Sequence, residues 1–582
     1  MKIKSSSESD HQMINQTPHG AIGQAFRPVR MGRYGTVVAN HPLAAQAGLQ
    51  TLMKGGNAVD AAVTVAFALG AAEPQGSSIG GDGFIMVHMK NELSLEVING
   101  TGAAPQSASA QQYPDGIPYS GVKSSSVPGI VDALLSAHEK HGKLNLETCI
   151  EPAIELCEEG VPVSHFQAIS AAKHSTLMTS PTSQAVFAPD GRPLKPGDIR
   201  RNPNLGSSYR LIAKQGRDAF YRGEIALEIA RFCSENGGFL TANDFKQHKV
   251  RWQVPITTNY GGRSVYEAPP NSSGHVLLQE LNLLECIKPK SFNYLSAEAI
   301  HLMVEAKKLA FADREEYLGD PEYIDIPIEG LISKEYAAER AKLIDPHRTL
   351  KNVPHGNPWA FQEKPRHFKK QNKDQISGNR SGSETTHFCI VDQWGNAVSE
   401  LQSIQTMFGS GVIAGKTGIL LNNRMTYWHL KPGHTNYLRP GRRVRHTMNP
   451  VMVFTNPIEK GGQLELVLGT PGGDTQVQTN FQVITGVFDH NLTVAEAIEG
   501  PRWTHYQGAT DSTYPHAPRN ELVIEDRISP KTFSELEAKG QSVKIIGPFE
   551  GAGSAGAIMV QRDSGVMMAA SDPRRDGYTA LW

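Results

Sequence analysis

Apolar residues recur at helical spacing through much of the first part of the chain. Residues 42–54 and 58–69 predict two helices, separated by a glycine pair that ends the first and by Asn57, which caps the second. The stretch from residue 128 to residue 339 is predicted to be mostly helical. Its clearest helices are expected over residues 130–141 and 297–317.

Short segments of alternating apolar and polar residues predict strands, and most of these lie in the last third of the chain. They cover residues 85–88, 93–98, 387–391, 397–404, 451–454 and 464–468. The order is therefore helix-rich and then strand-rich, which is compatible with layered helices and sheets.

Two segments lack any apolar periodicity. Residues 1–30 are rich in Ser, His, Gln and Asn and predict a flexible tail. Residues from about 354 to 384 are rich in Pro, Gly, Asn, Ser and Lys and predict an exposed linker. The linker ends directly before the strands of the last third.

The composition is that of an ordinary globular protein. The 582 residues are 39% hydrophobic and 20% charged, which argues against a disordered, collagen-like or coiled-coil chain. Lys plus Arg, at 57, nearly balances Asp plus Glu, at 58. The net charge of -1 gives no electrostatic reason to expect nucleic acid or an acidic membrane as a partner, and a small neutral or anionic substrate remains open.

The five cysteines are scattered and form no C-x-x-C pair, so neither a disulfide framework nor a thiolate zinc site is indicated. Residues 1–30 contain no apolar signal segment. The most apolar stretch, residues 58–72, carries Asp60 and is too short to cross a bilayer. We therefore expect a soluble protein in a reducing, cytoplasmic compartment.

Three short motifs resemble known functional signatures but lack the required context. Ser78 lies in a G-x-S-x-G sequence that follows a helix instead of a strand, which argues against a nucleophile elbow. Gly415-Lys416-Thr417 lacks the first glycine of a phosphate loop. His138 and His141 are one residue too close for a zinc-binding helix and are expected to be surface histidines.

A stronger signal lies where the linker becomes a strand, at Glu384-Thr385-Thr386-His387-Phe388. Glycine-rich segments follow it, including Gly472-Gly473. Taken alone, Thr385 is compatible with an ordinary β-forming residue at a strand start. The glycines are compatible with hairpin turns or with backbone N–H donors that hold an anion.

With these segments in view, the chain from about residue 35 to residue 582 resembles the γ-glutamyltransferase (γ-glutamyltranspeptidase) family of N-terminal-nucleophile hydrolases. The matching motifs occur in one order at residues 55–62, 80–84, 126–129, 218–221, 269–274, 312–321 and 571–574. The resemblance implies a four-layer αββα sandwich, with two stacked sheets between two helical layers.

The resemblance also implies an inactive precursor that cuts itself at the Glu384-Thr385 bond. The products would be a large chain, in which residues 31–384 follow the tail of residues 1–30, and a small chain of residues 385–582. The two chains would stay associated. The Thr385 hydroxyl would be the nucleophile and its freed α-amine the base. The substrate would be a small-molecule amide, and the acyl group would pass to water or to an amine. No metal or organic cofactor is implied.

Other positions follow from the same resemblance. Gly472 and Gly473 would supply the oxyanion-binding N–H groups. Ser403, eighteen residues after the nucleophile, falls where the family has an orienting hydroxyl, usually threonine. A turn-forming role for Gly473 stays open, because paired glycines are common in turns.

The substrate-binding positions depart from the family pattern. Thr101 stands where an arginine that binds the substrate α-carboxylate is expected, and Tyr427 replaces an aspartate that binds the α-amine. Gln405 replaces an asparagine, and His446-Thr447 replaces a serine pair. An α-amino-acid head group therefore loses both of its charged partners, which predicts poor binding of glutathione-like substrates.

Arg424 replaces a family glutamine and is a candidate to bind a carboxylate in the site. A salt bridge to a structural Asp or Glu is the open alternative. An Arg424 that faces the site would favour a dicarboxylic or oxo-acid acyl group, similar to the acylase and amidohydrolase branches of the family. A true γ-glutamyl enzyme and a non-catalytic binding protein remain the alternative functions.

Overall fold

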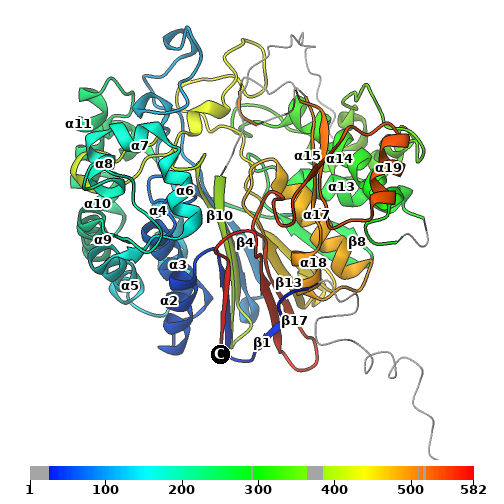
Figure 1. Ribbon diagram of the computed structural model, residues 1–582, viewed down its shortest axis with the longest axis horizontal. Coiled ribbons are helices and arrows are strands. Elements are labelled where there is room, and N and C mark those ends of the chain that lie inside the picture. The colour runs from blue at the N-terminus through cyan, green and yellow to red at the C-terminus, as the bar shows by residue number, and fades with distance from the viewer. Residues whose placement is uncertain (1–24, 290–292, 364–383, 509, 511, 515–518) are drawn as a thin grey trace, which may run out of the picture.

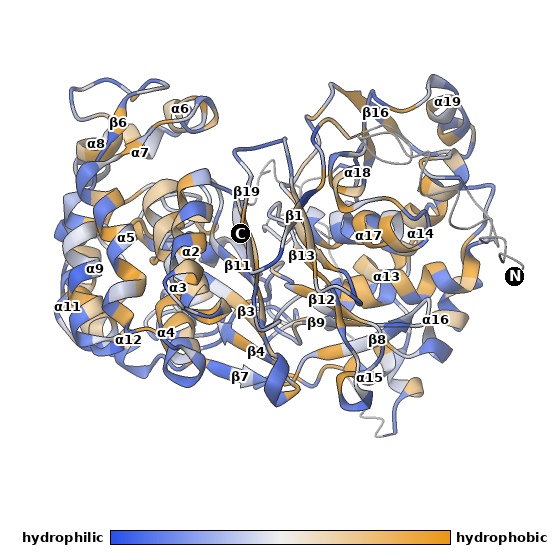
Figure 2. Cartoon of the chain, turned by 90° about the horizontal axis from the view of Figure 1, so that it is seen from below, coloured by the Kyte–Doolittle hydropathy of each residue, from blue (hydrophilic) through white to orange (hydrophobic). Residues whose placement is uncertain are grey.

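Two facing β-sheets form the centre of the molecule, and helices cover the outer face of each (Figure 1). The computed structural model describes residues 25–289, 293–363, 384–508, 510, 512–514 and 519–582. In Figure 2 the two sheets are seen nearly edge-on between the two helical layers. This arrangement confirms the expected four-layer αββα sandwich.

The first sheet holds the predicted nucleophile. Its seven strands are, in spatial order, β19 (Tyr578–Leu581), β2 (Gly35–Ala39), β10 (Glu384–Asp392), β11 (Ala397–Gln405), β3 (Asp82–Met89), β4 (Ser94–Gly100) and β7 (Arg251–Gln253). The second sheet contains β1 (Arg30–Gly32), β18 (Met567–Ser571), β17 (Gly556–Val560), β13 (Leu464–Gly469), β12 (Val451–Phe454), β9 (Arg263–Glu267) and β8 (Ile256–Tyr260).

Both sheets mix strands from the two sides of the Glu384-Thr385 bond. In the first sheet β10 and β11 lie between β2 and β3, and in the second β12 and β13 lie between β17 and β9. Backbone hydrogen bonds of a central sheet therefore join the two predicted chains. A cut at this bond would leave the sheets hydrogen-bonded.

Helices of the first layer lie against the first sheet (blue to green in Figure 1). They are α2 (Pro42–Met53), α3 (Ala58–Ala72), α4 (Ile130–His141), α5 (Leu146–Glu159), α6 (His165–Ala172), α7 (Ser175–Thr179), α8 (Pro181–Phe187), α9 (Pro203–Gln215), α10 (Arg217–Tyr221), α11 (Glu224–Glu235) and α12 (Ala242–Gln247). The predicted cap of α3 is confirmed, because Asn57 and Asp60 form a reciprocal capping box.

The other layer covers the second sheet (Figure 1). It contains α13 (Gly274–Ile287), α14 (Ala297–Tyr317), α15 (Ile328–Leu331), α16 (Lys334–Ala341), α17 (Thr475–Phe488), α18 (Val494–Glu499) and α19 (Pro530–Ala538). A small sheet of β14 (Trp503–Tyr506), β15 (Glu521–Glu525) and β16 (Val543–Ile546) lies at its edge, and β5 (Val161–Pro162) pairs with β6 (Ile199–Arg200) elsewhere.

Side-chain alternation along the strands produces separate cores. Phe84 and Met86 of β3 point between the sheets, whereas Ile85 and Val87 pack against the first helical layer. A third cluster fills the space between the second sheet and its helices. Strands of the first sheet therefore have two buried faces, which fixes their register.

Local predictions differ from the structure in several places, of which two are the largest. The stretch predicted to be mostly helical also contains the β8–β9 hairpin, whose turn is formed by Gly261 and Gly262, both with positive φ. The strand-rich last third also contains α17, α18 and α19. Sheet formation overrides local periodicity at the hairpin, because its two strands pair with each other and β9 also pairs with β12.

The two polar segments lie mostly outside the described residues, which begin at residue 25 and leave out 364–383. Of the predicted tail, Phe26 and Arg27 donate hydrogen bonds to the Glu499 carboxylate. Of the predicted linker, residues 358–361 form a short 3-10 helix in which Trp359 is buried. Within the described residues, every helix is too short or too polar to cross a membrane.

Candidate active site

Thr385 lies at the start of β10, one residue after a break in the sheet register. Glu384 pairs with Gln405 and Thr386 pairs with Gln402, so a β-bulge lies between Glu384 and Thr386. The bulge leaves Thr385 without a direct cross-strand partner, and its side chain is buried. A bulge redirects side chains, and here it brings the Thr385 hydroxyl to Ser403 of β11.

The Ser403 hydroxyl connects the two residues of the predicted cleavage bond. It lies 3.2 Å from Thr385 Oγ1 and donates a hydrogen bond of 2.8 Å to the Glu384 carbonyl oxygen. It accepts from the Gln405 amide at 2.9 Å and from Arg424 Nη2 at 2.9 Å. Because these two nitrogens only donate, they direct the Ser403 proton toward the Glu384 carbonyl.

The predicted glycine pair lies in the turn between β13 and α17. Gly472 has φ +125° and Gly473 has φ +59°, conformations that favour glycine. The Gly473 carbonyl accepts from the Gln476 amide at 3.1 Å, so Gln476 belongs to the same turn. Among the described residues, neither glycine N–H donates a hydrogen bond, which leaves both available to an anion.

Gln476 joins this turn to Thr385. Its Nε2 lies 3.5 Å from Thr385 Oγ1, and its Oε1 is buried without a hydrogen bond among the described residues. The N-terminus of α17, the glycine pair and the Thr385 hydroxyl therefore meet at one place. Helix N-termini stabilise negative charge, as a tetrahedral intermediate requires.

Arg424 is fully buried and faces both Ser403 and Asp82. Its Nη2 contacts the Ser403 hydroxyl, and its Nε lies 3.2 Å from Asp82 Oδ2. The structure therefore combines the two alternatives considered from the sequence, because Arg424 reaches the site while it is held in an ion pair. Burial raises the pKa of Asp82 to about 6, and the Arg424 charge opposes this rise.

His446 completes the Asp82 cluster. Its Nε2 lies 3.6 Å from Asp82 Oδ2, and neither ring nitrogen makes a hydrogen bond to the described residues. Burial, together with the charges of Arg424 and Arg443, lowers the pKa of His446 well below its usual value. His446 is therefore neutral at physiological pH.

The remaining predicted binding residues surround this cluster. The Thr101 hydroxyl donates to Asn99 Oδ1 at 2.7 Å, and Gly102, the next residue, donates its amide to Asp82 at 2.8 Å. The Tyr427 hydroxyl lies 3.4 Å from the Thr447 hydroxyl, and its ring lies 5.0 Å from the Arg424 guanidinium carbon. Gln405 Nε2 donates to Thr513 Oγ1 at 3.3 Å.

Sequence reasoning missed two residues of the site. Asp82 belongs to the Gly80–Gly83 segment, and its position in a motif beside two glycines was the available signal. Gln476 gave no signal of its own, because nothing in the sequence places the first turn of α17 beside Thr385. Both became visible only from the packing of the two sheets.

A buried carboxyl lies next to the predicted cleavage bond. Glu73, just after α3, accepts a hydrogen bond from the Thr386 hydroxyl. Burial raises the pKa of Glu73 to about 8, and the Thr386 bond and the Arg575 charge oppose this rise. Glu73 is therefore mostly protonated at neutral pH.

The sequences rejected as catalytic motifs have structural roles. The Ser78 hydroxyl donates to the Leu420 carbonyl at 2.8 Å, and Lys416 and Thr417 lie in a 3-10 turn. The expectation of two surface histidines was wrong for His141, which is buried beside Glu96. His138 is half-buried, and its ring contacts the Leu144 carbonyl in the segment after α4.

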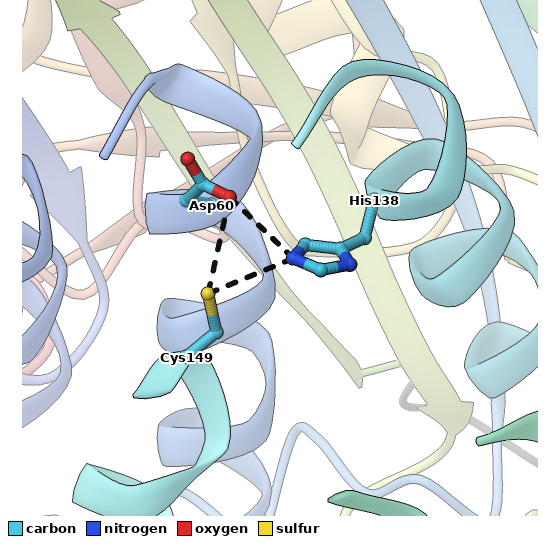
Figure 3. Close-up of side chains that lie close together, drawn as sticks. All are labelled: Asp60, His138 and Cys149. Atoms are coloured by element: carbon cyan, nitrogen blue, oxygen red, sulfur yellow. Dashed lines mark hydrogen bonds and ion pairs between the residues drawn. The ribbon is translucent and has the colours of Figure 1, made fainter. Parts of the chain in front are cut away.

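His138 meets Asp60 and Cys149 in a cluster with the residue types of a metal site (Figure 3). The hydrogen bonds favour a structural role. Asp60 accepts the amides of Lys143 and Leu144, and His138 Nε2 donates to the Leu144 carbonyl at 2.9 Å. A nitrogen that carries this proton cannot ligate a metal, and burial raises the pKa of Cys149 to about 12.

A second cluster of Glu315, His429 and His434 lies on α14 and the loop after β11. The two rings stack at 3.5 Å, and His434 Nε2 lies 3.2 Å from Glu315 Oε1. His434 Nδ1 accepts the Asn436 amide, which places the proton on Nε2 and makes this nitrogen a donor to Glu315. The other Glu315 oxygen is bound by Arg445 at 2.6 Å.

Comparisons with known proteins agree with this geometry. The family described as Gamma-glutamyltranspeptidase matches residues 44–582. The glutathione hydrolase proenzyme of Escherichia coli is 36% identical, over 97% of this chain and 94% of the relative. The glutathione hydrolase-like YwrD proenzyme of Bacillus subtilis is 35% identical, over 93% of this chain and 97% of the relative.

A solved structure is also similar to this chain in three dimensions. The cephalosporin acylase from Bacillus halodurans superposes with a TM-score of 0.84 at 31% identity, covering 96% of this chain and 97% of the acylase. The protein is therefore a member of the γ-glutamyltranspeptidase family and an enzyme of the N-terminal-nucleophile hydrolase fold.

Proposed function

We propose that the protein is a self-processing amidohydrolase that forms an acyl-enzyme on Thr385. The observation that carries this proposal is the position of Ser403, which contacts the Thr385 hydroxyl and donates to the Glu384 carbonyl. The nucleophile and the carbonyl that it would attack are held by one side chain. The relatives named as proenzymes support a processed precursor.

In the first reaction Thr385 Oγ attacks the Glu384 carbonyl carbon. The C–N bond breaks, the nitrogen takes the hydroxyl proton, and an ester joins Glu384 to Thr385. Water then hydrolyses this ester, giving a carboxylate on Glu384 and a free α-amine on Thr385. The Ser403 hydrogen bond polarises the carbonyl and stabilises the developing oxyanion.

In the mature enzyme the α-amine of Thr385 takes the proton of its own hydroxyl as Oγ attacks the substrate amide. The amine of the substrate leaves with that proton, and an ester remains on Thr385. Water, or an acceptor amine in a transfer reaction, then releases the acyl group. The N–H groups of Gly472 and Gly473 would each stabilise the oxyanion by about 3 kcal/mol.

The substrate side favours an acylase over a γ-glutamyl enzyme. The Thr101 hydroxyl donates to Asn99, and the Tyr427 hydroxyl lies 3.4 Å from the Thr447 hydroxyl. Both side chains are uncharged, so neither supplies a charge for an amino-acid head group. Arg424 is already neutralised by Asp82. We propose an acyl group that lacks the α-amine, as in the acylase branch of the family.

Two measurements test this function. Mass spectrometry of the purified protein is expected to give two chains split at Glu384-Thr385, while Thr385→Ala stays intact. Glutaryl-anilide turnover is expected to exceed γ-glutamyl-anilide turnover. A faster γ-glutamyl reaction would identify a glutathione hydrolase, and an intact, inactive wild type would identify a binding protein.

A further inference from the structure

The side chain of Glu384 is held by a largely buried arginine, Arg575. Arg575 Nη1 lies 2.6 Å from Glu384 Oε2, and Nη2 lies 3.0 Å from Oε1, so the contact is bidentate. The side chains are 10% and 12% exposed. The guanidinium also lies 5.5 Å from the centre of the Phe166 ring. Among the described residues, this is the only ion pair that Arg575 makes.

Two other acidic groups near Arg575, Asp572 and Glu73, do not replace this partner. Both oxygens of Asp572 are engaged, one by Arg502 at 2.7 Å and the other by Arg574 at 3.0 Å. Glu73 is mostly protonated at neutral pH, because burial raises its pKa to about 8. If Glu384 left, Arg575 would be a largely buried cation without its ion-pair partner, and it would need a new anion.

Glu384 has to leave its present position for the mature enzyme to work. Its carbonyl accepts from Ser403, whose hydroxyl also contacts Thr385 Oγ1, and the carbonyl carbon of a substrate must come within reach of the same Thr385 hydroxyl. After cleavage, the β10–β11 pairing with Gln405, the Ser403 bond and the Arg575 ion pair are the contacts that hold it. An incoming acyl group competes with each of these contacts.

The structure of the Glu384 residue indicates which acyl group could occupy the same position in the mature enzyme. From its carbonyl carbon to its side-chain carboxylate, a glutamyl residue has the same carbon chain as a glutaryl group. The carbonyl is bonded to the Thr385 nitrogen, and the distal carboxylate lies on Arg575. The precursor therefore carries a covalently attached analogue of a glutaryl amide within its own site.

We propose that Arg575 binds the distal carboxylate of a glutaryl-type acyl group, and that Glu384 occupies this subsite in the precursor. The inference rests on the proposed function, because it names the acyl group that Thr385 transfers. It assigns to Arg575 the role that the sequence suggested for Arg424. Arg424 is committed to Asp82, whereas the partner of Arg575 is removable by the cleavage itself.

Chemical protection of the arginine tests the subsite without a substitution at Arg575. Mature wild type is treated with phenylglyoxal, with or without glutarate or valerate, and the modified arginines are located by mass spectrometry. We expect glutarate to reduce modification of Arg575 at least about tenfold and valerate to have no effect. The uncleaved Thr385→Ala precursor is expected to be protected without added ligand.

Turnover supplies the second test. Glutaryl-anilide and valeryl-anilide are compared in wild type, Arg575→Gln and Arg575→Lys, per cleaved Thr385. Arg575→Gln is expected to lower the glutaryl-to-valeryl ratio of kcat/KM at least about tenfold, mainly through KM, and Arg575→Lys to restore part of it. Arg562→Gln, at a half-exposed arginine that pairs with Glu465, is the matched control and is expected to leave the ratio unchanged.

The results that would refute the Arg575 subsite differ from those that would refute the proposed function. If wild type is cleaved and hydrolyses anilides, but Arg575 reacts equally with and without glutarate, the assignment of Arg575 is wrong. An unchanged ratio in cleaved Arg575→Gln would also overturn it. An uncleaved wild type would instead refute the Thr385 mechanism itself.

Discussion

The Ser403 hydroxyl donates a hydrogen bond of 2.8 Å to the carbonyl oxygen of Glu384, the residue before the proposed nucleophile. Ser403→Ala removes this donor and the contact with Thr385. We expect self-cleavage to slow about 100-fold, because loss of one oxyanion donor typically has that effect. Ser403→Thr keeps the hydroxyl and is expected to cleave at a rate close to wild type. Gel electrophoresis during refolding measures both rates, and equal rates for Ala and Thr would contradict the role.

The glycine turn gives a prediction on the mature reaction. A Cβ on Gly472 would lie 2.3 Å from Thr475 Oγ1, and its φ of +125° is strained for other residues. Gly472→Ala is expected to shift the N–H groups of the turn and to lower kcat about 100-fold or more. The measurement is kcat per cleaved Thr385 on an acyl-anilide.

A matched variant separates strain from position. Gly461 also has a positive φ, +76°, but a Cβ there would meet no atom within 4 Å. Gly461→Ala is expected to cost some stability and to leave kcat unchanged. Equal losses of kcat in the two variants would show that the Gly472 effect is general destabilisation.

The sequence was sufficient for elements whose local signals agree with their final environment. The helix over 130–141 and the strand over 451–454 were predicted at the observed bounds. The α3 cap followed from Asn57 because a capping box is a local interaction. The β8–β9 hairpin was missed because its pairing with β12 depends on residues almost 190 positions away.

For the site, the sequence supplied candidates but not their contacts. The resemblance placed Thr385, Ser403 and the glycine pair by position alone, and the structure brings Thr385, Ser403 and the turn of Gln476 together. The sequence could not show that Arg424 is neutralised by Asp82, because the two residues lie in different elements, Asp82 in β3 and Arg424 in a 3-10 turn more than 300 residues later. It also gave no reason to connect Glu384 with Arg575, which lie 191 residues apart.

The Asp82–Arg424 pair predicts a coupled effect on stability. Asp82→Asn keeps the shape but leaves Arg424 as a buried charge without its partner, which is expected to cost about 3 kcal/mol. The double variant Asp82→Asn with Arg424→Met removes both charges and is expected to recover most of this loss. Urea unfolding measures the two values. A double variant no more stable than Asp82→Asn would show that the pair is not the cause.

Glu73 predicts how stability depends on pH. Its pKa is raised from 4.5 to about 8, chiefly by burial, so the folded state keeps a proton that the unfolded state has released. The stabilising contribution is therefore complete below pH 4.5 and is lost as the pH rises through 8. Glu73→Gln keeps an acceptor for Thr386 without this titration. Relative to wild type, its free energy of unfolding is expected to rise by about 1.4 kcal/mol per pH unit between these limits.

The comparison isolates Glu73 because the other buried carboxyls are present in both proteins. Glu459→Gln, at an exposed position in a surface turn, is the matched control and is expected to follow wild type at every pH. Urea titrations at intervals from pH 4.5 to pH 9 supply the curves. Parallel curves for Glu73→Gln and wild type would show that Glu73 ionises normally in the folded protein. The conclusion that Glu73 is protonated at neutral pH beside the Glu384-Thr385 bond would then be wrong.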